Sequence, residues 1–494
     1  MHPEAAVAAF VLRPLVYPLG SQRSKRCQIL QAGRGMLEND DMVSGMMHSL
    51  RLSLLAGSVA MVIASAVTDV TFNRDILPIL QQNCQSCHRP GEIGPMALLT
   101  YQGTRPWAKA IKAAVVERKM PPWFADPRFG HFANDRRLSD TDVAKITAWV
   151  DAGAPEGDAK DKPAPIAWLD GWNIKPDVQF EMPKAYSVPK NGTVEYTYFV
   201  IPSGFTKDTW VADAEIRPGN RAVVHHVSVY IRPPGSKWLP DAPRDGSAYV
   251  PPKRGAQGVS LPANRAADAP PVGPAQNEWF VGYVPGIQPQ RYFAPEMNSA
   301  KLIPAGSDIV FELHYTANGK EAGEDRSKVG FVLAKQPPKY RLLTLGVADA
   351  TFAIPPGDAN YEAKANATFA QPVTVIYLQP HMHLRGKDME IKFQYPTGES
   401  QTMLNVPHYS YLWQTIYYEK EPLAVPKGTR VDVTAHWDNS ANNPLNPDPT
   451  ATIRWGDQSW DEMLVPFVGV LVDRDTDPGK VMAQARPRAV IAAP

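Results

Sequence analysis

The segment 221–233 reads RAVVHHVSVYIRP and is rich in β-branched and aromatic residues, which favour strands. Three other segments share this composition: VEYTYFVIP at 194–202, SDIVFELHYTA at 307–317 and PVTVIYLQPHMHL at 372–384. Proline and glycine flank these runs, and both residues are typical of strand ends and turns. The pattern predicts antiparallel β-sandwich or jelly-roll domains.

Proline-rich stretches suggest where these domains begin and end. The chain has 49 prolines in 494 residues, against a usual level of about 5%. The stretch 158–176 is expected to be a linker, and Gln336-Pro337-Pro338 marks a second break. Between Pro233 and Pro295 we expect a long loop that serves as a lid or binding loop. The expected jelly rolls and the tail are 177–336, 337–478 and 479–494.

The overall composition excludes several classes of protein. Hydrophobic residues make up 44% and charged residues 20% of the chain, and the formal net charge is +1. These values are typical of a folded chain and give no global field that would attract nucleic acid. Because no apolar run reaches about 18 residues, we expect no stable membrane span.

The first 66 residues contain an export signal. A basic Arg51 precedes an apolar stretch, Leu52–Ile63, and Ala64-Ser65-Ala66 follows as a small-residue cleavage pattern. We expect cleavage after Ala66, translation from Met46 or Met47, and a periplasmic or secreted protein. The alternative interpretation of this stretch is a buried or anchoring helix.

The segment CQSCH at 84–88 has the spacing of a covalent haem attachment site. Cys84 and Cys87 would form thioether bonds to the haem, and His88 would bind the iron. A zinc site would need more thiols than this chain offers, since Cys27 is the one other cysteine. Met120, which precedes Pro121-Pro122, is the expected second axial ligand. The alternatives for that position are Met96 and His131.

A predicted helix follows this motif and completes a small domain. In LSDTDVAKITAWVDAGAP, at 138–155, Ser139 and Asp142 form an N-terminal cap, and Gly153 and Pro155 end the helix. This arrangement resembles the class I cytochrome c fold. The resemblance implies a small all-α haem domain at 67–157 that passes single electrons.

Five histidines fall within three of the β-patterned runs: His225, His226, His314, His381 and His383. Residues at i and i+2 share one face of a strand, so His381 and His383 can bind one ion together. Adjacent residues face opposite ways, so His225 and His226 can share an ion only at a strand end or a bulge. Each pattern alone is weak evidence, and the alternative is a pair of hydrogen-bonded histidines.

The order of the motifs resembles that of the copper type II monooxygenases, the family of peptide-amidating and dopamine-hydroxylating enzymes. The motifs are His225-His226, His314-Tyr315, His381-Met382-His383 and Asp461-Glu462-Met463. The resemblance implies an electron-transfer copper on His225, His226 and His314. It implies a second, catalytic copper, where O₂ binds, on His381, His383 and Met463.

The sequence departs from the peptide-amidating branch at three positions. Where that branch has the arginine, asparagine and tyrosine that contact its substrate, this chain has Gln379, Val465 and Phe467. Peptidylglycine is therefore not the expected substrate. His408 and His436 are assigned no role.

Together the two resemblances predict an exported copper monooxygenase that hydroxylates a C–H bond of a small organic substrate with O₂. It would carry two copper ions and one covalent haem. Electrons would come from an external reductant, ascorbate or a periplasmic redox protein, and pass through the haem. The alternatives are a non-catalytic copper-binding electron-transfer protein and a haem-linked dehydrogenase that inserts no oxygen.

Overall fold

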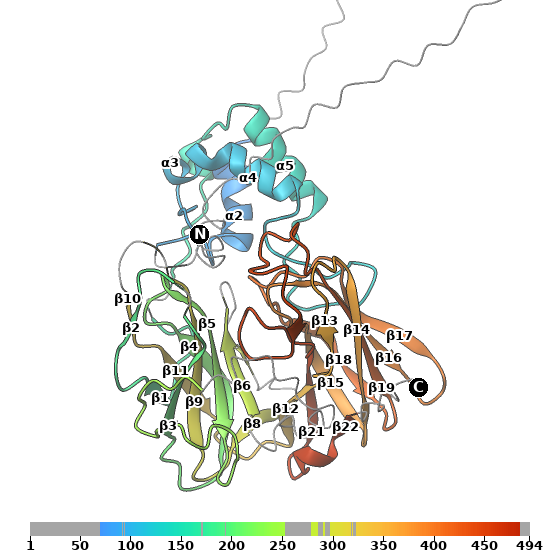
Figure 1. Cartoon of the computed structure of the whole chain (residues 1–494). Coiled ribbons are helices and arrows are strands. Elements are labelled where there is room, and N and C mark those ends of the chain that lie inside the picture. Colours follow the sequence, from blue (N-terminus) through green and yellow to red (C-terminus); the bar gives the residue numbers. More distant parts are fainter. Residues whose placement is uncertain are drawn as a thin grey trace, which may run out of the picture. The chain divides into compact units, whose positions relative to one another are not determined.

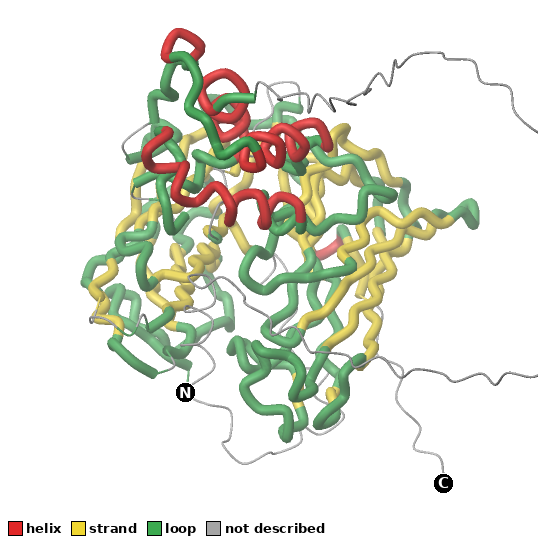
Figure 2. Tube along the Cα trace, turned by 90° about the horizontal axis from the view of Figure 1, so that it is seen from above, coloured by secondary structure: helices red, strands yellow, loops and turns green. Residues whose placement is uncertain are grey.

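A computed structural model describes residues 70–484, apart from positions 91, 93, 169–170, 193, 252–277, 285–289, 292–296, 318 and 320–322. The expected signal peptide and start site lie outside the described residues. The described chain is mostly β-sheet with few helices, as the sequence predicted (Figure 1). Figure 2 shows most of the helices in one group, with the rest of the described chain in strands and loops. Within the described residues, no helix is long and apolar enough to cross a membrane.

All but one of the described helical elements precede the first strand. They are η1 (Phe72–Ile76), α2 (Leu77–Asn83), α3 (Tyr101–Thr104), η2 (Arg105–Trp107), α4 (Ala108–Val116), α5 (Asp140–Asp151) and η3 (Ala159–Asp161). Helix α5 begins with the expected cap, because the Ser139 side chain accepts a hydrogen bond from the Asp142 backbone N–H. It ends before Gly153, whose φ of 86° suits a residue without a Cβ.

These helices enclose a core of their own. Phe72 at the start of η1 packs on Trp149 of α5, with ring centroids 6.0 Å apart, and both side chains are fully buried. The Trp149 indole N–H donates to the Pro155 carbonyl at 3.0 Å, so the ring is fixed at both ends. Replacing a core tryptophan with alanine costs about 3–5 kcal/mol of stability. Aromatic packing therefore holds η1 and α5 together.

The strands of the first half are β1 (Val178–Glu181), β2 (Tyr186–Val188), β3 (Thr197–Pro202), β4 (Thr209–Arg217), β5 (Val224–Arg232), β6 (Glu278–Tyr283), β7 (Gln290–Arg291), β8 (Ser299–Ile303), β9 (Asp308–Tyr315), β10 (Gly323–Asp325) and β11 (Lys328–Leu333). Those of the second half are β12 (Tyr340–Gly346), β13 (Ala353–Ile354), β14 (Tyr361–Phe369), β15 (Val373–Gln379), β16 (Gly386–Gln394), β17 (Ser400–Val406), β18 (Tyr417–Val425), β19 (Arg430–Trp437), β20 (Ile453–Arg454), β21 (Phe467–Asp473) and β22 (Met482–Gln484). A short helix, η5 (Pro478–Lys480), precedes β22.

One long sheet runs through both halves, in the order β1-β11-β4-β8-β12-β21-β15-β18, with β7 also paired to β4. Its pairs are antiparallel except where β8 meets β12, which run parallel with Tyr340 opposite Ser299. A four-stranded sheet, β3-β9-β5-β6, and a five-stranded sheet, β17-β16-β19-β14-β22, complete the main layers. The strands before and after Pro337-Pro338 therefore belong to one sheet.

The central strands of the long sheet serve two hydrophobic cores. Leu342 of β12 and Leu471 of β21 are buried in the core beneath the four-stranded sheet. Their neighbours Leu343 and Val470 are buried in the core beneath the five-stranded sheet. Because successive side chains of a strand point to opposite faces, both faces of these strands are covered. This explains why the run FVGVLV, at 467–472, is continuously apolar.

The stretch between Pro233 and Pro295, expected to be one long loop, contains a buried strand, so that expectation was wrong in part. The segment EWFVGY forms β6, which pairs with β5 so that Tyr283 lies opposite Val227. Trp279, Phe280 and Val281 are buried there. The local β signal was masked by the surrounding prolines and alanines.

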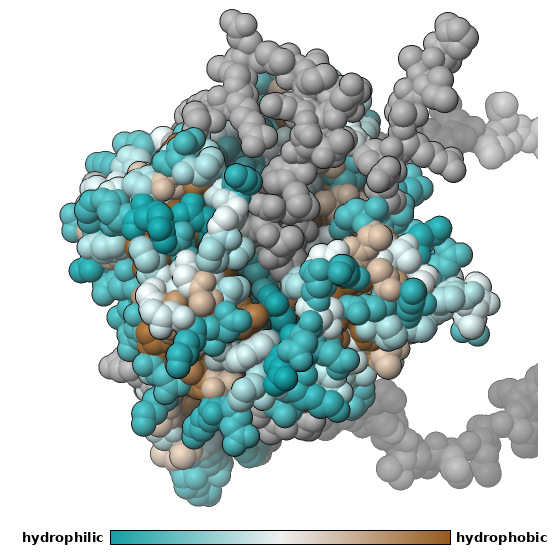
Figure 3. Space-filling model, turned by 90° about the horizontal axis from the view of Figure 1, so that it is seen from below, coloured by the Kyte–Doolittle hydropathy of each residue, from teal (hydrophilic) through white to brown (hydrophobic). Residues whose placement is uncertain are grey.

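On the face shown in Figure 3, hydrophilic side chains predominate and apolar ones form small separate patches.

Candidate metal and haem sites

A β-bulge brings His225 and His226 to one place. In the β5–β9 pair, Val224 lies opposite Tyr315 and His226 lies opposite His314, so the register shifts at His225. The extra residue allows adjacent side chains to turn toward the same neighbour, which is one of the two arrangements that the sequence left open. His314 reaches the same point from β9.

The three imidazoles converge through their Nδ1 atoms. The Nδ1 atom of His225 lies 3.3 Å from that of His226 and 3.2 Å from that of His314. Within the described part of the chain, these three residues form the one group of histidine, cysteine or carboxylate side chains that could hold a metal ion. The buried Nε2 atom of His225 has no hydrogen-bond partner among the described residues.

Burial keeps these rings in the form that binds metals. It lowers the pKa of His225 to about 3, with a further contribution from His314. The pKa of His226 is also held well below its usual value, chiefly by burial. Neutral imidazole is the ligand form of histidine and suits copper. The residues present therefore fit a copper ion.

Two tyrosines pack against this His225/His226/His314 cluster, and no local sequence pattern pointed to either. Tyr196 stacks flat on His314, with centroids 4.9 Å apart and planes 11° apart. Tyr411, from the loop between β17 and β18, stacks on His225 at 5.4 Å. Its hydroxyl lies 3.1 Å from the Nδ1 atom of His314. Both tyrosines are 3% exposed, so they screen the cluster from water.

His381 and His383 lie beyond the end of β15, so the strand geometry expected for them is wrong. They nevertheless come together, with ring centroids 5.2 Å apart and planes at 89°. The Nδ1–H of His381 donates to Gln414 Oε1 at 2.8 Å, and that of His383 to the Asp461 carbonyl at 3.2 Å. Because both Nδ1 atoms donate, each Nε2 atom keeps its lone pair for a metal.

The Glu462 carboxylate ties the two predicted motifs of this second cluster together. It accepts hydrogen bonds from the backbone N–H groups of His383 at 2.8 Å and Arg385 at 2.6 Å. It also accepts from the Trp437 indole at 2.9 Å. Burial raises the pKa of Glu462 to about 7. Met463 follows directly in the sequence and is half-buried.

The two histidine clusters are neighbours. The ring of Tyr411 lies 5.4 Å from that of His225 and 6.3 Å from that of His383. The pKa of His226, set mainly by burial, is also lowered by the charges of His381 and His383. One tyrosine ring thus contacts a member of each cluster.

The positions that depart from the peptide-amidating branch surround His381. Gln379 donates to the Gln414 carbonyl at 3.3 Å, and the Val465 N–H donates to the His381 carbonyl at 3.4 Å. The Phe467 ring lies 5.9 Å from the ring of His381. Trp279 of β6 stacks on Phe467 at 6.1 Å. The surroundings of His381 are therefore aromatic on this side.

The residues of the CQSCH segment fit a covalent haem. Cys84 and Cys87 are free, half-buried thiols, and burial raises the pKa of Cys84 to about 12. The Nδ1–H of His88 donates to the Met96 carbonyl at 3.3 Å, which leaves Nε2 available for iron. A Cβ at Gly94 would lie 2.6 Å from His88 Nδ1, so only glycine fits beside this ring.

The loop after the haem motif contacts the strands that carry the first histidine cluster. Glu92 forms ion pairs with Arg89, at 2.9 Å, and with Arg221, which lies just before β5. Tyr283 of β6 has its pKa raised mainly by burial, and Arg221 and Cys87 also influence it electrostatically. Tyr283 lies opposite Val227 of β5, the strand that carries His225 and His226.

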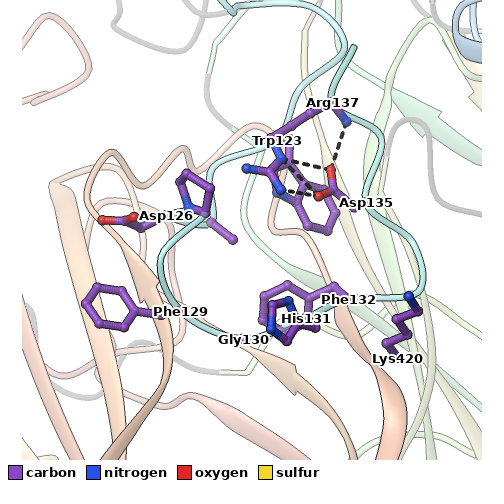
Figure 4. A pocket seen from close by; sticks show the side chains of 11 residues that line it. Trp123, Asp126, Phe129, Gly130, His131, Phe132, Asp135, Arg137 and Lys420 are labelled. Atoms are coloured by element: carbon purple, nitrogen blue, oxygen red, sulfur yellow. Dashed lines mark hydrogen bonds and ion pairs between the residues drawn. The ribbon is translucent and has the colours of Figure 1, made fainter. Parts of the chain in front are cut away.

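The segment from Trp123 to Asn134 belongs to the core of the second β half rather than to the helical core. Trp123 packs on Tyr417 of β18 at 4.9 Å, and the Asn134 amide donates to the Ile416 carbonyl. A cavity of about 210 Å³ lies along this segment. Figure 4 shows the Asp135–Arg137 ion pair on one side of it and His131 with Lys420 on the other.

The three axial-ligand candidates have different surroundings. His131 is exposed and lines the cavity just described. Met96 packs against the helical core and holds His88 through its backbone carbonyl. Met120 is half-buried and follows α4. Met120 stays the predicted axial ligand.

The two histidines without an assigned role lie apart from these clusters. His408 is exposed. His436 of β19 contacts Asp388 at 2.6 Å and Glu362 at 3.4 Å, which makes it part of a polar network on the five-stranded sheet.

No protein-family model and no curated protein matches this chain. Among solved structures, a subviral particle protein of infectious bursal disease virus is 10% identical, with a TM-score of 0.17, over 65% of this chain and 79% of that one. The major capsid protein of bacteriophage PM2 is 8% identical, with a TM-score of 0.22, over 63% and 99%. Allantoicase from Saccharomyces cerevisiae is 9% identical, with a TM-score of 0.15, over 58% and 80%. TM-scores this low support no conclusion about this chain.

Proposed function

We propose that this chain is an exported, copper-dependent monooxygenase that hydroxylates a C–H bond of a small organic substrate and receives its electrons through a fused c-type haem. The observation that carries the proposal is the pair of adjacent histidine clusters, one of which brings three imidazoles together through their Nδ1 atoms. Copper bound there would supply one-electron storage and activation of O₂. The overall reaction consumes one O₂, two electrons and two protons, and yields the alcohol and one water.

The proposed metal ligands form two separate sites. His225, His226 and His314 would hold the electron-transfer copper, and His381, His383 and Met463 the catalytic copper. A thioether ligand such as Met463 favours Cu(I), whereas imidazole accepts either oxidation state. Gln414 and the Asp461 carbonyl orient the rings of the second site, and such outer contacts set ligand geometry.

The residues around His381 define the class of substrate. Phe467 and Trp279 form an aromatic surface beside His381. The ring of Phe467 lies 5.9 Å from that of His381, and the ring of Trp279 lies 6.1 Å from that of Phe467. Such a surface would orient an apolar or aromatic part of the substrate and exclude water from it. Gln379, Val465 and Phe467 offer no cation for a peptide carboxylate. We therefore propose a small, largely apolar substrate other than peptidylglycine.

The helical residues 70–157 would form a cytochrome c domain that feeds the first copper site. Cys84 and Cys87 would hold the haem, with His88 and Met120 on its iron. The Glu92–Arg221 ion pair supports a direct route, because it attaches the haem-binding loop beside β5. Ascorbate or a periplasmic redox protein would reduce the haem.

Isotope incorporation tests the proposed reaction. Purified full-length protein, loaded with copper and haem, is incubated with ¹⁸O₂, reductant and a panel of small aromatic and aliphatic compounds. One labelled oxygen in a hydroxylated product, lost in His383→Ala and kept in His408→Ala, supports the proposal. Product without label would instead indicate a haem-linked dehydrogenase. Copper and haem reduction without any product would indicate an electron-transfer protein.

A further inference from the structure

The Tyr411 hydroxyl lies 3.1 Å from the Nδ1 atom of His314 in the first histidine cluster, and no motif identified this tyrosine. We propose that the Tyr411 phenol oxygen is a fourth ligand of the metal bound by His225, His226 and His314. This inference rests on the proposed copper site. The site would then be a three-histidine, one-tyrosine copper centre. The evidence is the spacing of the four donor atoms and the position of the tyrosine ring.

The spacing matches the edges of a coordination tetrahedron. The Nδ1 atom of His225 lies 3.3 Å from that of His226 and 3.2 Å from that of His314. The Tyr411 oxygen lies 3.1 Å from the Nδ1 atom of His314. Four donors around a metal at about 2.0–2.1 Å are separated by about 3.3–3.4 Å. These three distances place the Tyr411 oxygen beside the nitrogen of His314 at the separation expected of two donors on one metal.

The neighbouring tyrosine does not have this geometry. Tyr196 lies flat against the face of His314, so its ring covers the cluster. Its hydroxyl lies 3.5 Å from the Tyr411 hydroxyl. Tyr196 can therefore donate a hydrogen bond to the Tyr411 oxygen, and a donor of this kind stabilises a metal-bound phenolate. The pair supplies a ligand and its outer contact.

Binding of the Tyr411 oxygen to the metal would add one negative charge to the site but would not oxidise or reduce the metal. The O–H bond of Tyr411 breaks, its proton passes to the solvent, and an oxygen–metal bond forms. An anionic oxygen ligand favours Cu(II), whereas the Met463 thioether favours Cu(I). The two sites would then differ in potential, so that an electron passes downhill from the first cluster to the His381/His383/Met463 site.

Electron–nuclear double resonance on Cu(II) tests this ligand directly. Full-length protein carrying haem is prepared with ring-deuterated tyrosine, in the His383→Ala background, so that the copper signal comes from the first cluster. We expect strong deuterium couplings at the copper signal. Tyr411→Phe should remove them and weaken copper binding by about tenfold or more. Tyr196→Phe should keep them, because it removes the outer hydrogen bond and not the ligand. His408→Ala, an exposed change outside the cluster, is the control and should keep both the couplings and the copper affinity.

Two results would overturn the proposal. One is copper bound by three imidazoles without strong tyrosine couplings, which would leave the proposed function intact. The other is a set of strong couplings that persists in Tyr411→Phe. Failure of the first cluster to bind any copper would refute the ligand and the proposed function together. The labelled protein with Tyr411 in place gives an answer even where Tyr411→Phe does not fold.

Discussion

The side-chain oxygen of Gln414 lies 2.8 Å from the Nδ1 atom of His381, and Gln414 itself has a φ of 23°. A positive φ in a residue other than glycine is unfavourable and is found mostly where the surrounding structure imposes it. Gln414 also accepts a hydrogen bond from Gln379 through its backbone carbonyl. The loop is thus held in a strained conformation that orients one ring of the second cluster.

Replacing Gln414 with leucine should weaken copper binding at the His381/His383/Met463 site. Without the acceptor, His381 is free to change tautomer and orientation, and loss of such a contact costs about 10–100-fold in metal affinity. Competition with a chelator measures the two copper affinities separately. Gln401→Leu, an exposed change on β17, is the control. Equal weakening at both sites would show that Gln414 acts on the fold instead.

Removal of one cysteine should abolish stable haem attachment. Cys84→Ser leaves one thioether at most, so the haem is released under denaturing conditions that leave the native attachment intact. Mass spectrometry of the denatured, exported protein measures the bound haem. Ser86→Ala, within the same motif, should keep it. Full haem retention in Cys84→Ser would argue against the c-type assignment.

Disruption of the Glu92–Arg221 ion pair should slow electron transfer from the haem to copper. Both side chains are 18% exposed, and Glu92 keeps its second partner, Arg89, when Arg221 is replaced. Arg221→Gln should therefore lower the electron-transfer rate while the Arg89–Glu92 pair remains. Arg221→Lys, which keeps the positive charge beside Glu92, should retain much of the rate. Stopped-flow absorbance follows haem oxidation, and an unchanged rate in Arg221→Gln would exclude this contact from the route.

Lys301 should make the stability of the protein rise with pH in the alkaline range. Its ammonium group is fully buried, donates to the Trp279 carbonyl and to Thr344, and has its pKa lowered from 10.5 to about 8 by burial. Between these values the unfolded chain binds a proton that the folded chain does not. The free energy of unfolding therefore decreases as the pH falls through this range and increases as the pH rises through it.

Denaturant unfolding at pH 8 and pH 10 measures this effect. Relative to Lys301→Met, the wild-type free energy of unfolding should increase by about 2 kcal/mol between these two pH values. The difference between the two proteins removes the contribution of other groups that titrate in this range. A constant difference would show that Lys301 keeps its ordinary pKa in the fold.

Local sequence patterns predicted some of the structure well. The β-rich character, the cap of α5 and the bulge at His225 follow from short-range rules about residue type and alternation. The segment EWFVGY shows the limit of such rules, because a buried strand was hidden among prolines. His381 and His383 come together through Gln414 and the Asp461 carbonyl rather than through a strand.

The rest of the candidate site depends on contacts between distant parts of the chain. Tyr411 reaches His314 across 97 positions, and Glu462 reaches His383 across 79. Neither residue stands in a pattern that local periodicity can detect. Trp123 likewise joins the core of the second β half from a position within the expected haem domain, 67–157. Such contacts follow from the packing of whole sheets.

The most direct test of the proposed function is a count of metals and electrons in the purified mature protein. Elemental analysis and haem assay give the cofactor content, and an anaerobic ascorbate titration gives the electrons accepted per chain. The expected result is about two coppers and one haem, which together accept about three electrons. One haem without tightly bound copper, even after reconstitution, would contradict the monooxygenase proposal.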